Sequence, residues 1–421
     1  MQLSSKQKEF WNEPYHRYYI KHGATRAGKT YLDYFIVPRR IRERNDLDGL
    51  IVMLGNSKGT LQRNVIEPMQ NIYGTQLVSS IRSDNVATMF GERVHCLGAD
   101  NIARVDKLRG MSVKYVYGDE ITTWNEEVFQ MLKSRLDRPY SCLDATCNPK
   151  GPDHWVKKLI DDPDVDVFGQ NYSIDDNPFL DAAVRESMKR EHRGVFYERY
   201  IMGRWVVAEG LVFPYFDEEK ERWLVDVTLD KQAVKARGKE LPLSRICIGI
   251  DFGETGSLTA MHAVGFVGGH DGLIVLEEAE RVRTERLDTE EIASACASFC
   301  AMVRAKYGRY DFVFGDAAAP ALINRVSALL RDMGQPWRNV TACRKTPLES
   351  RPVSVDGLLC ADRLMICRRC NGLIRALSQL RWDEKDPSVP EDKNADNIND
   401  YWDSFNYAWS HWAQYFDRRM Q

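Results

Sequence analysis

The segment that most restricts the fold of this chain is GATRAGKT, at residues 23–30. It has the spacing G-x-x-x-x-G-K-T, in which glycines let backbone N–H groups close around phosphate and the lysine reaches the β and γ oxygens. The apolar run YYI precedes it and the helical run YLDYFIV follows, as this motif requires. The segment predicts a binding loop for ATP with Mg²⁺, formed by Gly23, Thr25, Arg26, Ala27, Gly28, Lys29 and Thr30, the last also a Mg²⁺ ligand.

An acidic pair supports the same function. The segment VKYVYGDE at 113–120 has the pattern of an apolar strand that ends in Asp119 and Glu120. Beside a phosphate loop, Asp119 would hold Mg²⁺ and Glu120 would orient and activate the attacking water. Two adjacent acids can also merely cap a following helix, but their combination with the phosphate loop favours ATP hydrolysis.

Further residues fit supporting roles at the same site. Arg26 in the loop or Arg135 in LKSRLDRP would stabilise charge on the transferred phosphoryl group. Thr146 or Asn148 in TCNP would sense the γ-phosphate, and Gln7 would read adenine through its amide. Each of these residues also has a non-functional interpretation. The arginines can be solvated surface residues, TCNP can be an ordinary Asn-Pro turn, and Gln7 can be an exposed glutamine. The choice between the two arginines stays open.

The pattern of strands changes character once along the chain. Short apolar runs separated by long polar stretches, as in buried parallel strands with crossover helices, lie at 50–54, 113–117 and 142–146. Later runs joined by Gly-containing turns, as in an antiparallel meander, lie at 246–252, 258–266 and 273–278, with further strands at 311–314 and 340–343. We therefore predict an α/β ATPase domain with a mostly parallel sheet over 1–210, a linker over 211–240 and an α/β domain with a mixed sheet over 241–421.

The second domain carries its own acidic residues. Asp251 ends the strand-like run RICIGID, Asp316 ends YDFVFGD, and Asp400 and Asp403 lie three apart on a final helix whose other face is aromatic. Acids at two strand ends and on a late helix can converge on two Mg²⁺ or Mn²⁺ ions about 4 Å apart, which cleave phosphodiesters. This order is that of ribonuclease H-like nucleases. The DFG tripeptide at 251–253 does not indicate a protein kinase, because the chain has no HRD loop and no kinase glycine loop.

Net charge gives no sign of a nucleic-acid partner. The chain has 58 basic and 61 acidic residues, a formal charge of -3, so contact with DNA would depend on local charge. The segment 185–204 mixes Lys and Arg with aromatic residues and would suit a surface that follows phosphates. It also suits an amphipathic helix that closes the ATPase domain, and we favour this second interpretation slightly.

The remaining patterns concern cysteines and location. Cys367 and Cys370 form a CxxC without a second ligand pair, so we expect reduced, structural thiols rather than a zinc site. The chain has neither a signal-peptide layout nor a run of roughly 20 apolar residues. We expect no secretion and no membrane association.

Taken in order, the motifs resemble those of the large terminase subunit of tailed bacteriophages and prophages. The resemblance runs over nearly the whole length and rests on GATRAGKT, KLRG, VYGDE, SRLDRP, TCNP, GRW, EGLVFP, GIDFG, FGDAAAP, SVDGL, CNGLI, RWDE and DYWDSFNYAW. It implies an ATPase that pumps double-stranded DNA into a procapsid and a ribonuclease H-like nuclease that cuts concatemeric DNA. It also implies a ring, commonly of five subunits, that meets a portal protein and a small terminase subunit in the host cytoplasm.

The last helix departs from the family pattern H-x-x-D-A-x-R-Y. Asp400 stands at the histidine place, and Ser404 and Asn406 replace the alanine and the arginine. Asp400, Asp403 or both would then bind metal, and the sequence leaves this open.

Two other classes of protein remain possible on the sequence. One is a repair or recombination ATPase of the helicase type fused to a nuclease, which would unwind strands. The other is an assembly scaffold that uses the phosphate loop as a nucleotide switch and has an inactive nuclease. Unwinding assays and metal-dependent plasmid nicking distinguish them.

Overall fold

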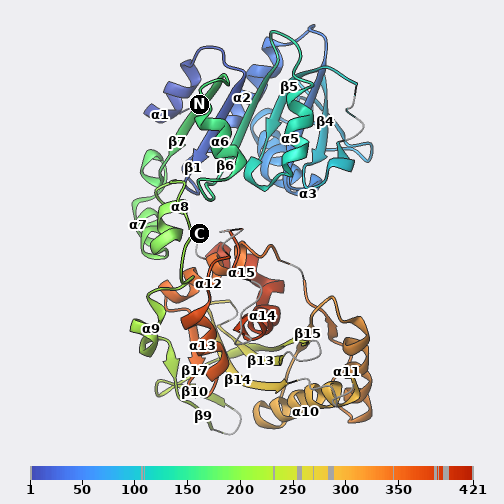
Figure 1. Cartoon of the computed structure of the whole chain (residues 1–421), viewed down its shortest axis with the longest axis vertical. Coiled ribbons are helices and arrows are strands. Elements are labelled where there is room, and N and C mark those ends of the chain that lie inside the picture. The colour runs from blue at the N-terminus through green and yellow to red at the C-terminus, as the bar shows by residue number, and fades with distance from the viewer. Residues whose placement is uncertain are drawn as a thin grey trace. The chain divides into compact units, whose positions relative to one another are not determined.

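The computed structural model describes residues 2–105, 108, 110–230, 233–253, 258–268, 270–282, 289–344, 346–383, 386, 388–391 and 398–419. The chain divides into two compact units (Figure 1). The first unit comprises Met1–Lys189 and Gly194–Val207, and the second comprises Arg190–Arg193 and Ala208–Gln421.

The first unit is built on a seven-stranded sheet with the order β3-β4-β2-β5-β6-β1-β7. Every neighbouring pair is parallel except β3 and β4. The strands at the centre are buried along their whole length, as the apolar runs predict. The strands are β1 (Tyr18–Gly23), β2 (Leu50–Gly55), β3 (Val86–Met89), β4 (Glu92–Gly98), β5 (Val113–Gly118), β6 (Cys142–Cys147) and β7 (Val167–Tyr172).

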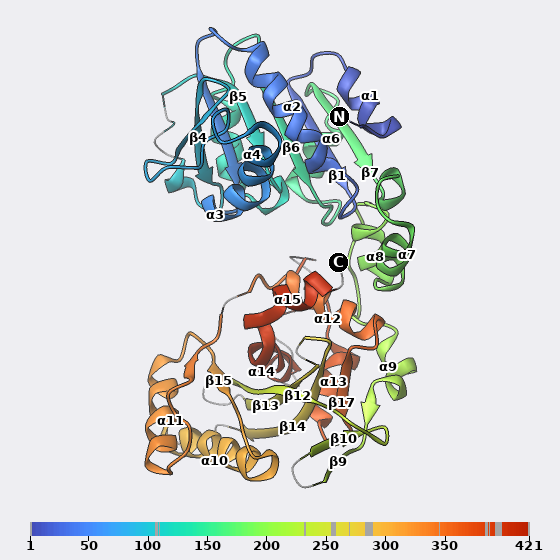
Figure 2. The ribbon, with the colours of Figure 1, turned by 180° about the vertical axis from the view of Figure 1, so that it is seen from behind.

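Helices cover both faces of this sheet. One core joins α2 and α4 to the face that carries Tyr19 of β1, and the other joins α5 and α6 to the face that carries Ile20 (Figures 1 and 2). This alternation along β1 is the period of two that a strand between two helical layers requires. The helices are α1 (Ser5–Asn12), α2 (Lys29–Glu43), α3 (Lys58–Leu61), the π-helix η1 (Gln62–Ile66), α4 (Glu67–Tyr73), α5 (Glu126–Lys133), α6 (Trp155–Asp161), α7 (Ala182–Arg190) and α8 (Gly194–Tyr200).

The second unit has a mixed seven-stranded sheet with the order β16-β15-β12-β13-β14-β17-β8. The predicted meander is confirmed, because β13 is antiparallel to both of its neighbours and every other pair is parallel. The strands are β8 (Leu224–Val225), β12 (Leu243–Asp251), β13 (Leu258–Val267), β14 (Gly272–Val282), β15 (Phe312–Gly315), β16 (Val340–Ala342) and β17 (Leu364–Cys367).

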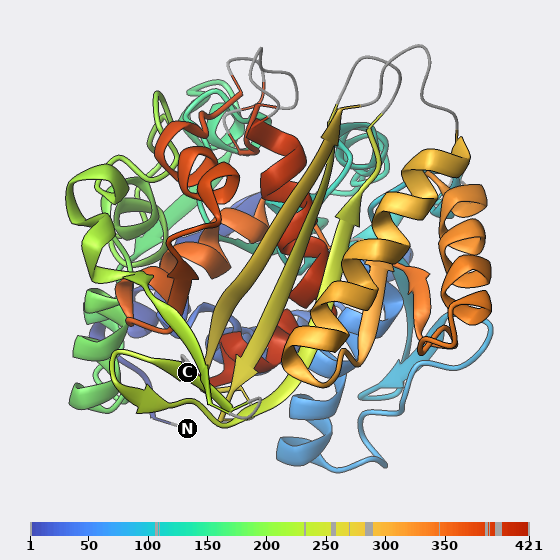
Figure 3. The same cartoon turned by 90° about the horizontal axis from the view of Figure 1, so that it is seen from below.

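The helices of this unit also lie on two faces of the sheet (Figure 3). Ile248 and Ile250 of β12 pack into a core with α10 and α11. Gly249, between them, faces α14, and a side chain here would collide with the carbonyl of Ser404. The helices are α9 (Phe216–Glu219), α10 (Thr289–Tyr307), α11 (Pro320–Asp332), α12 (Ser350–Cys360), α13 (Asn371–Gln379), α14 (Ile398–Trp409) and α15 (Ala413–Arg419).

The α/β fold of both predicted domains is thus confirmed. The segment 211–240, predicted as a linker, lies in the second unit. It holds α9, β8 and a small three-stranded sheet of β9 (Val227–Asp230), β10 (Ala233–Ala236) and β11 (Lys239–Glu240). Within the described part of the chain, no helix is long and apolar enough to cross a membrane.

Candidate ATP site and candidate nuclease site

The phosphate loop connects the carboxyl end of β1 to the start of α2. Gly23, at φ 142°, passes so close to β7 that a side chain would collide with the carbonyl of Tyr172. The same carbonyl accepts a hydrogen bond from the N–H of Ala24 at 2.6 Å, and the carbonyl of Tyr200 accepts one from Thr25 at 3.0 Å. Gly28, at φ 86°, begins α2 in the left-handed region. The two glycines therefore stand where this loop requires them.

Lys29 lies buried inside the loop. Its Nζ donates to the carbonyls of Gly23 at 2.9 Å and Ala24 at 2.6 Å, and to Oδ1 of Asn148 at 3.1 Å. Burial lowers the pKa of Lys29, while the Glu120 carboxylate opposes this shift. The structure thus brings together the predicted phosphate-binding lysine, the predicted sensor Asn148 and the predicted base Glu120.

Asp119 and Glu120 follow directly after β5. The Asp119 side chain is buried, and burial followed by the charge of Glu120 raises its pKa to about 7. Glu120 adopts φ 51°, a left-handed conformation that is rare outside glycine and is found at functional sites. Burial also raises the pKa of the Glu120 carboxyl, against the charge of Lys29. A raised pKa suits a carboxylate that accepts a proton near neutral pH.

Two contacts at this site have no counterpart in the sequence motifs. The Asn64 side chain hydrogen-bonds Asp119, and it comes from the π-helix η1, a type of turn common at functional sites. The Asn177 amide donates to the carbonyl of Arg26 at 2.8 Å. No sequence pattern predicts a π-helix, and none pairs two residues as distant in sequence as Arg26 and Asn177. Both contacts were therefore missed by the sequence analysis.

Gln7 is buried against the loop rather than exposed. Its Nε2 donates to the carbonyl of Gly28 at 2.8 Å, and its Oε1 accepts from the backbone N–H of Ser4 at 2.9 Å. Its backbone N–H in turn donates to the Ser4 hydroxyl, which completes a capping box at the start of α1. The amide therefore ties α1 to the phosphate loop, and recognition of adenine by Gln7 stays a prediction.

The two candidate arginines lie at opposite edges of the sheet. Arg26 is exposed within the phosphate loop, at φ 57°. The carbonyl of Arg135 accepts a hydrogen bond from Val113 at 2.8 Å, which places it at the amino end of β5. The phosphate loop lies at the carboxyl end of β1, which runs parallel to β5 in the same sheet, so Arg135 lies at the other end of the strands from the phosphate loop of its own chain.

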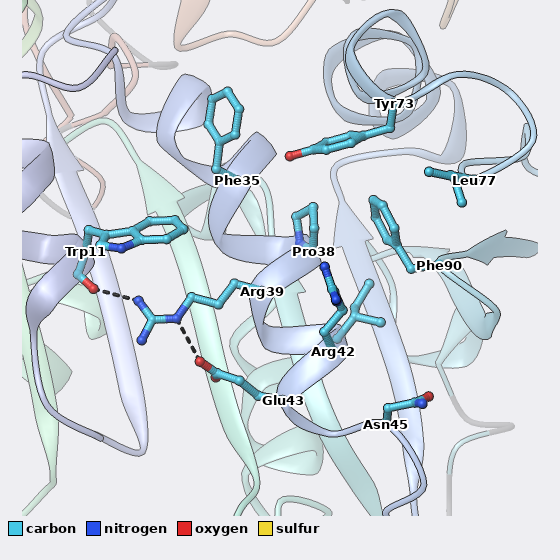
Figure 4. Close-up of a pocket in the computed structure, with 11 residues that line it drawn as sticks. Trp11, Phe35, Pro38, Arg39, Arg42, Glu43, Asn45, Tyr73, Leu77 and Phe90 are labelled. Carbon is cyan, nitrogen blue, oxygen red and sulfur yellow. Dashed lines mark hydrogen bonds and ion pairs between the residues drawn. The ribbon is translucent and has the colours of Figure 1, made fainter. Parts of the chain in front are cut away.

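A separate cavity of about 1000 Å³ lies along the second half of α2 (Figure 4). Arg39 spans it, donating to the carbonyl of Trp11 at 2.6 Å and to Oε1 of Glu43 at 2.7 Å. Its walls include the aromatic residues Phe35, Tyr73 and Phe90. None of the predicted site residues lines it, so this cavity is distinct from the candidate ATP site.

In the second unit, two strand ends meet at one edge of the sheet. Asp251 ends β12, and Asp316 follows β15, whose Gly315 pairs with Ile250 in parallel register. The N–H of Asp316 donates to the carbonyl of Ile250 at 3.2 Å. Because Gly249 allows α14 to lie directly on β12, Asp400 and Asp403 of that helix reach the same edge.

Three of these carboxylates act on the fourth, Asp251. Burial raises the pKa of Asp251 well above its ordinary value, and Asp403, Asp400 and Asp316 raise it further. Burial raises the pKa of Asp400 to about 6. Such a set of oxygen donors fits divalent Mg²⁺ or Mn²⁺, whose charge would relieve the repulsion. Among the residues with described positions, no three His, Cys, Asp or Glu side chains lie close enough together to hold a metal ion as they stand.

Comparison with known proteins agrees with this architecture. Residues 22–220 match the family described as "Terminase large subunit, T4likevirus-type, N-terminal". Over this range the chain is similar to the N-terminal part of large terminases. No curated protein matches the chain significantly.

The whole chain shares its fold with the large terminase of a thermophilic bacteriophage. One crystal form of that protein aligns with a TM-score of 0.81 and 23% identity, over 97% of this chain and 99% of that one. The same phage protein in complex with ADP aligns with a TM-score of 0.78 at 23% identity, over 96% and 98% of the two chains. Its complex with ATP-gamma-S aligns with a TM-score of 0.77 at 24% identity, over the same shares. The predicted resemblance is confirmed.

The second unit contains a buried histidine beside the four candidate metal-binding acids, which the sequence did not reveal. His262 of β13 contacts the hydroxyl of Ser404 through Nδ1 at 2.7 Å and Oε2 of Glu278 through Nε2 at 3.0 Å. Glu278 also accepts the backbone N–H groups of Gly372 at 2.7 Å and Leu373 at 2.8 Å. The histidine thereby fixes α14, one residue beyond Asp403, against the sheet of the second unit.

The basic segment 185–204 is engaged within the chain at several points. Lys189 pairs with Asp175 at 2.8 Å, and the buried Arg199 donates to the carbonyl of Val206 at 2.9 Å. These contacts suit the packing role slightly favoured above, while DNA contact by this segment stays a prediction. Both Cys367 and Cys370 are buried, and Cys370 directly precedes α13.

Proposed function

We propose that this protein is a DNA-packaging motor subunit with two activities. The first unit hydrolyses ATP to move double-stranded viral DNA into a procapsid, and the second cleaves concatemeric DNA by two-metal phosphodiester hydrolysis. The observation that carries the proposal is that Lys29, Asp119 and Glu120 lie close together at the carboxyl ends of the strands of the first unit. In the second unit, Asp251 lies near three other carboxylates. The thermophilic-phage terminase, solved with ADP and with ATP-gamma-S, supports a nucleotide as the ligand of the first unit.

ATP binding would exchange one set of contacts of Lys29 for another. The ammonium now bonds to the carbonyls of Gly23 and Ala24, which are weaker acceptors than phosphate oxygens. It would turn from them to the β and γ oxygens, while Thr30 and Asp119 hold Mg²⁺. Glu120 would then accept a proton from the water that attacks the γ-phosphorus, and Arg26 or a neighbour's Arg135 would stabilise the developing charge.

Asn148 links the nucleotide to the rest of the first unit. Its side chain accepts from Lys29, and its backbone carbonyl accepts from the hydroxyl of Thr122 at 3.2 Å. Loss of the γ-phosphate would therefore change the partner of Lys29 and, through Asn148, the segment that follows Glu120. This is the route by which hydrolysis would move DNA.

In the second unit, the carboxylates of Asp251, Asp316 and Asp403, with Asp400, would hold the metals. Two bound Mg²⁺ or Mn²⁺ ions supply an activated water and neutralise the leaving 3′ oxygen. Asp251 belongs to this set because it ends β12, which pairs with the strand before Asp316 and packs against α14. The fixed packing of α14 on Gly249 sets the spacing between these acids.

The assembly that we propose follows from the same function. Subunits would form a ring, commonly of five, around double-stranded DNA, with a portal protein and a small terminase subunit as partners in the host cytoplasm. A ring supplies the neighbour that Arg135 needs, since Arg135 lies far from the phosphate loop of its own chain.

The ATPase half is tested by ATP turnover in the presence of DNA. We expect Glu120→Gln to lower turnover by about 10²- to 10⁴-fold, the range for loss of a general base, while ATP binding persists. Glu127→Gln is the matched control, because Glu127 is exposed on α5 of the same unit. Normal turnover by Glu120→Gln contradicts the assignment.

A strand-displacement assay separates this function from a repair helicase. A packaging motor moves along intact duplex, so we expect no displacement of an annealed oligonucleotide during ATP turnover. Displacement coupled to turnover would favour the helicase class instead.

A further inference from the structure

Arg351 is a cation built into the cluster of nuclease acids. It lies at the start of α12 and is only 7% exposed. Its Nη1 donates to Oδ1 of Asp403 at 2.6 Å, and its Nε donates to the hydroxyl of Thr346 at 3.3 Å. Its guanidinium also lies 5.5 Å from the ring centre of Tyr407, one helical turn after Asp403. Three contacts therefore hold the charge in place.

The position of this charge matters for a metal site. The guanidinium donates to Oδ1 of Asp403 at 2.6 Å, so its charge neutralises part of the negative charge of the cluster. An oxygen of Asp403 that accepts this short, charge-assisted hydrogen bond has less electron density for a cation, and two cations on one carboxylate repel. Arg351 and a metal ion therefore compete for Asp403.

We propose that Arg351 is an internal counter-ion that occupies Asp403 in the metal-free protein and must leave it when metal binds. The proposal rests on the nuclease function proposed above, because only that function makes Asp403 a metal ligand. The arginine balances the charge of Asp403 without metal, and it sets the metal concentration at which the site fills. Arg351 is thus a positioning residue for the acids.

Calorimetric titration of the full chain with Mn²⁺ tests this competition. We expect Arg351→Gln to bind Mn²⁺ about tenfold more tightly, the effect of removing one charge-assisted hydrogen bond. Arg369→Gln is the matched control, because Arg369 pairs with a different carboxylate, Glu277, at 2.7 Å, and its Mn²⁺ affinity should equal that of the wild type. Equal or weaker binding by Arg351→Gln overturns the proposal, since a purely structural arginine would give that result.

Two further variants complete the test. Asp251→Asn should abolish Mn²⁺ binding at this site. If Asp251→Asn binds Mn²⁺ like the wild type, the proposed metal site itself is wrong, whatever the affinity of Arg351→Gln. Arg351→Lys keeps the charge but not the planar fork, so its affinity should fall between those of the wild type and Arg351→Gln. If thermal melting shows that Arg351→Gln does not fold, binding by Arg351→Lys at or below the wild-type affinity overturns the proposal.

Discussion

Replacement of Asp119 by asparagine should stabilise the metal-free protein while abolishing ATP hydrolysis. The carboxyl is buried, and its pKa is raised from 3.8 to about 7. The folded protein therefore holds this proton more tightly than the unfolded chain, so the group costs stability increasingly as pH rises from about 4 to about 7. Asparagine keeps an oxygen acceptor for Thr146 and Asn64 but carries no charge.

The magnitude follows from the two pKa values. One pKa unit corresponds to about 1.4 kcal/mol, so above pH 7 the ionised Asp119 costs about 4 kcal/mol of unfolding free energy. At pH 5 only the interval from 3.8 to 5 contributes, which is roughly a third of this cost. The gain in unfolding free energy from Asp119→Asn should therefore more than double between pH 5 and pH 8.

Scanning calorimetry with EDTA at the two pH values measures this difference. For a unit of this size, about 1 kcal/mol shifts Tm by about 2–4 °C, so we expect a gain of roughly 8 °C or more at pH 8 and roughly a third of that gain at pH 5. Asp48→Asn, an exposed aspartate in the same unit, is the control and should change Tm little at either pH. An equal gain at both pH values, or a loss at pH 8, would refute the electrostatic reasoning.

Two further substitutions test how the sites are held. Gly249→Val should abolish metal-dependent nicking of plasmid DNA but not ATP turnover, because the new side chain meets the carbonyl of Ser404 and pushes α14 away; nicking at the wild-type rate would contradict this packing. Gln7→Ala removes the hydrogen bond to Gly28, worth about 1 kcal/mol, and should raise the KM for ATP several-fold in a turnover assay. An unchanged KM would show that the phosphate loop does not need α1.

The strands and the phosphate loop are predictable from the sequence because their signals are local. A run of apolar residues such as 113–117 specifies a buried strand by itself, and the loop between Gly23 and Thr30 is set by spacing alone. Asp251 and Asp316 are also predictable, since acids that end parallel strands meet at one sheet edge.

The residues that the sequence did not reveal act across long separations. His262 and Ser404 are 142 positions apart, and Arg351 and Asp403 are 52 apart. Their pairing depends on how helices pack on the sheet, which no single motif specifies. Arg135 is the opposite case. The sequence shows its motif, but only the register of the sheet shows that Arg135 lies far from the phosphate loop.

Nicking of plasmid DNA with Mn²⁺, with ATP turnover measured on the same preparations, tests most directly whether one chain holds both activities. We predict that the wild type nicks DNA, that Asp251→Asn does not, and that both hydrolyse ATP at similar rates. Asp332→Asn, which changes an exposed aspartate on α11 of the second unit, should nick like the wild type. Equal nicking by Asp251→Asn, or loss of ATP hydrolysis together with nicking, would contradict the assignment of the two activities to separate units.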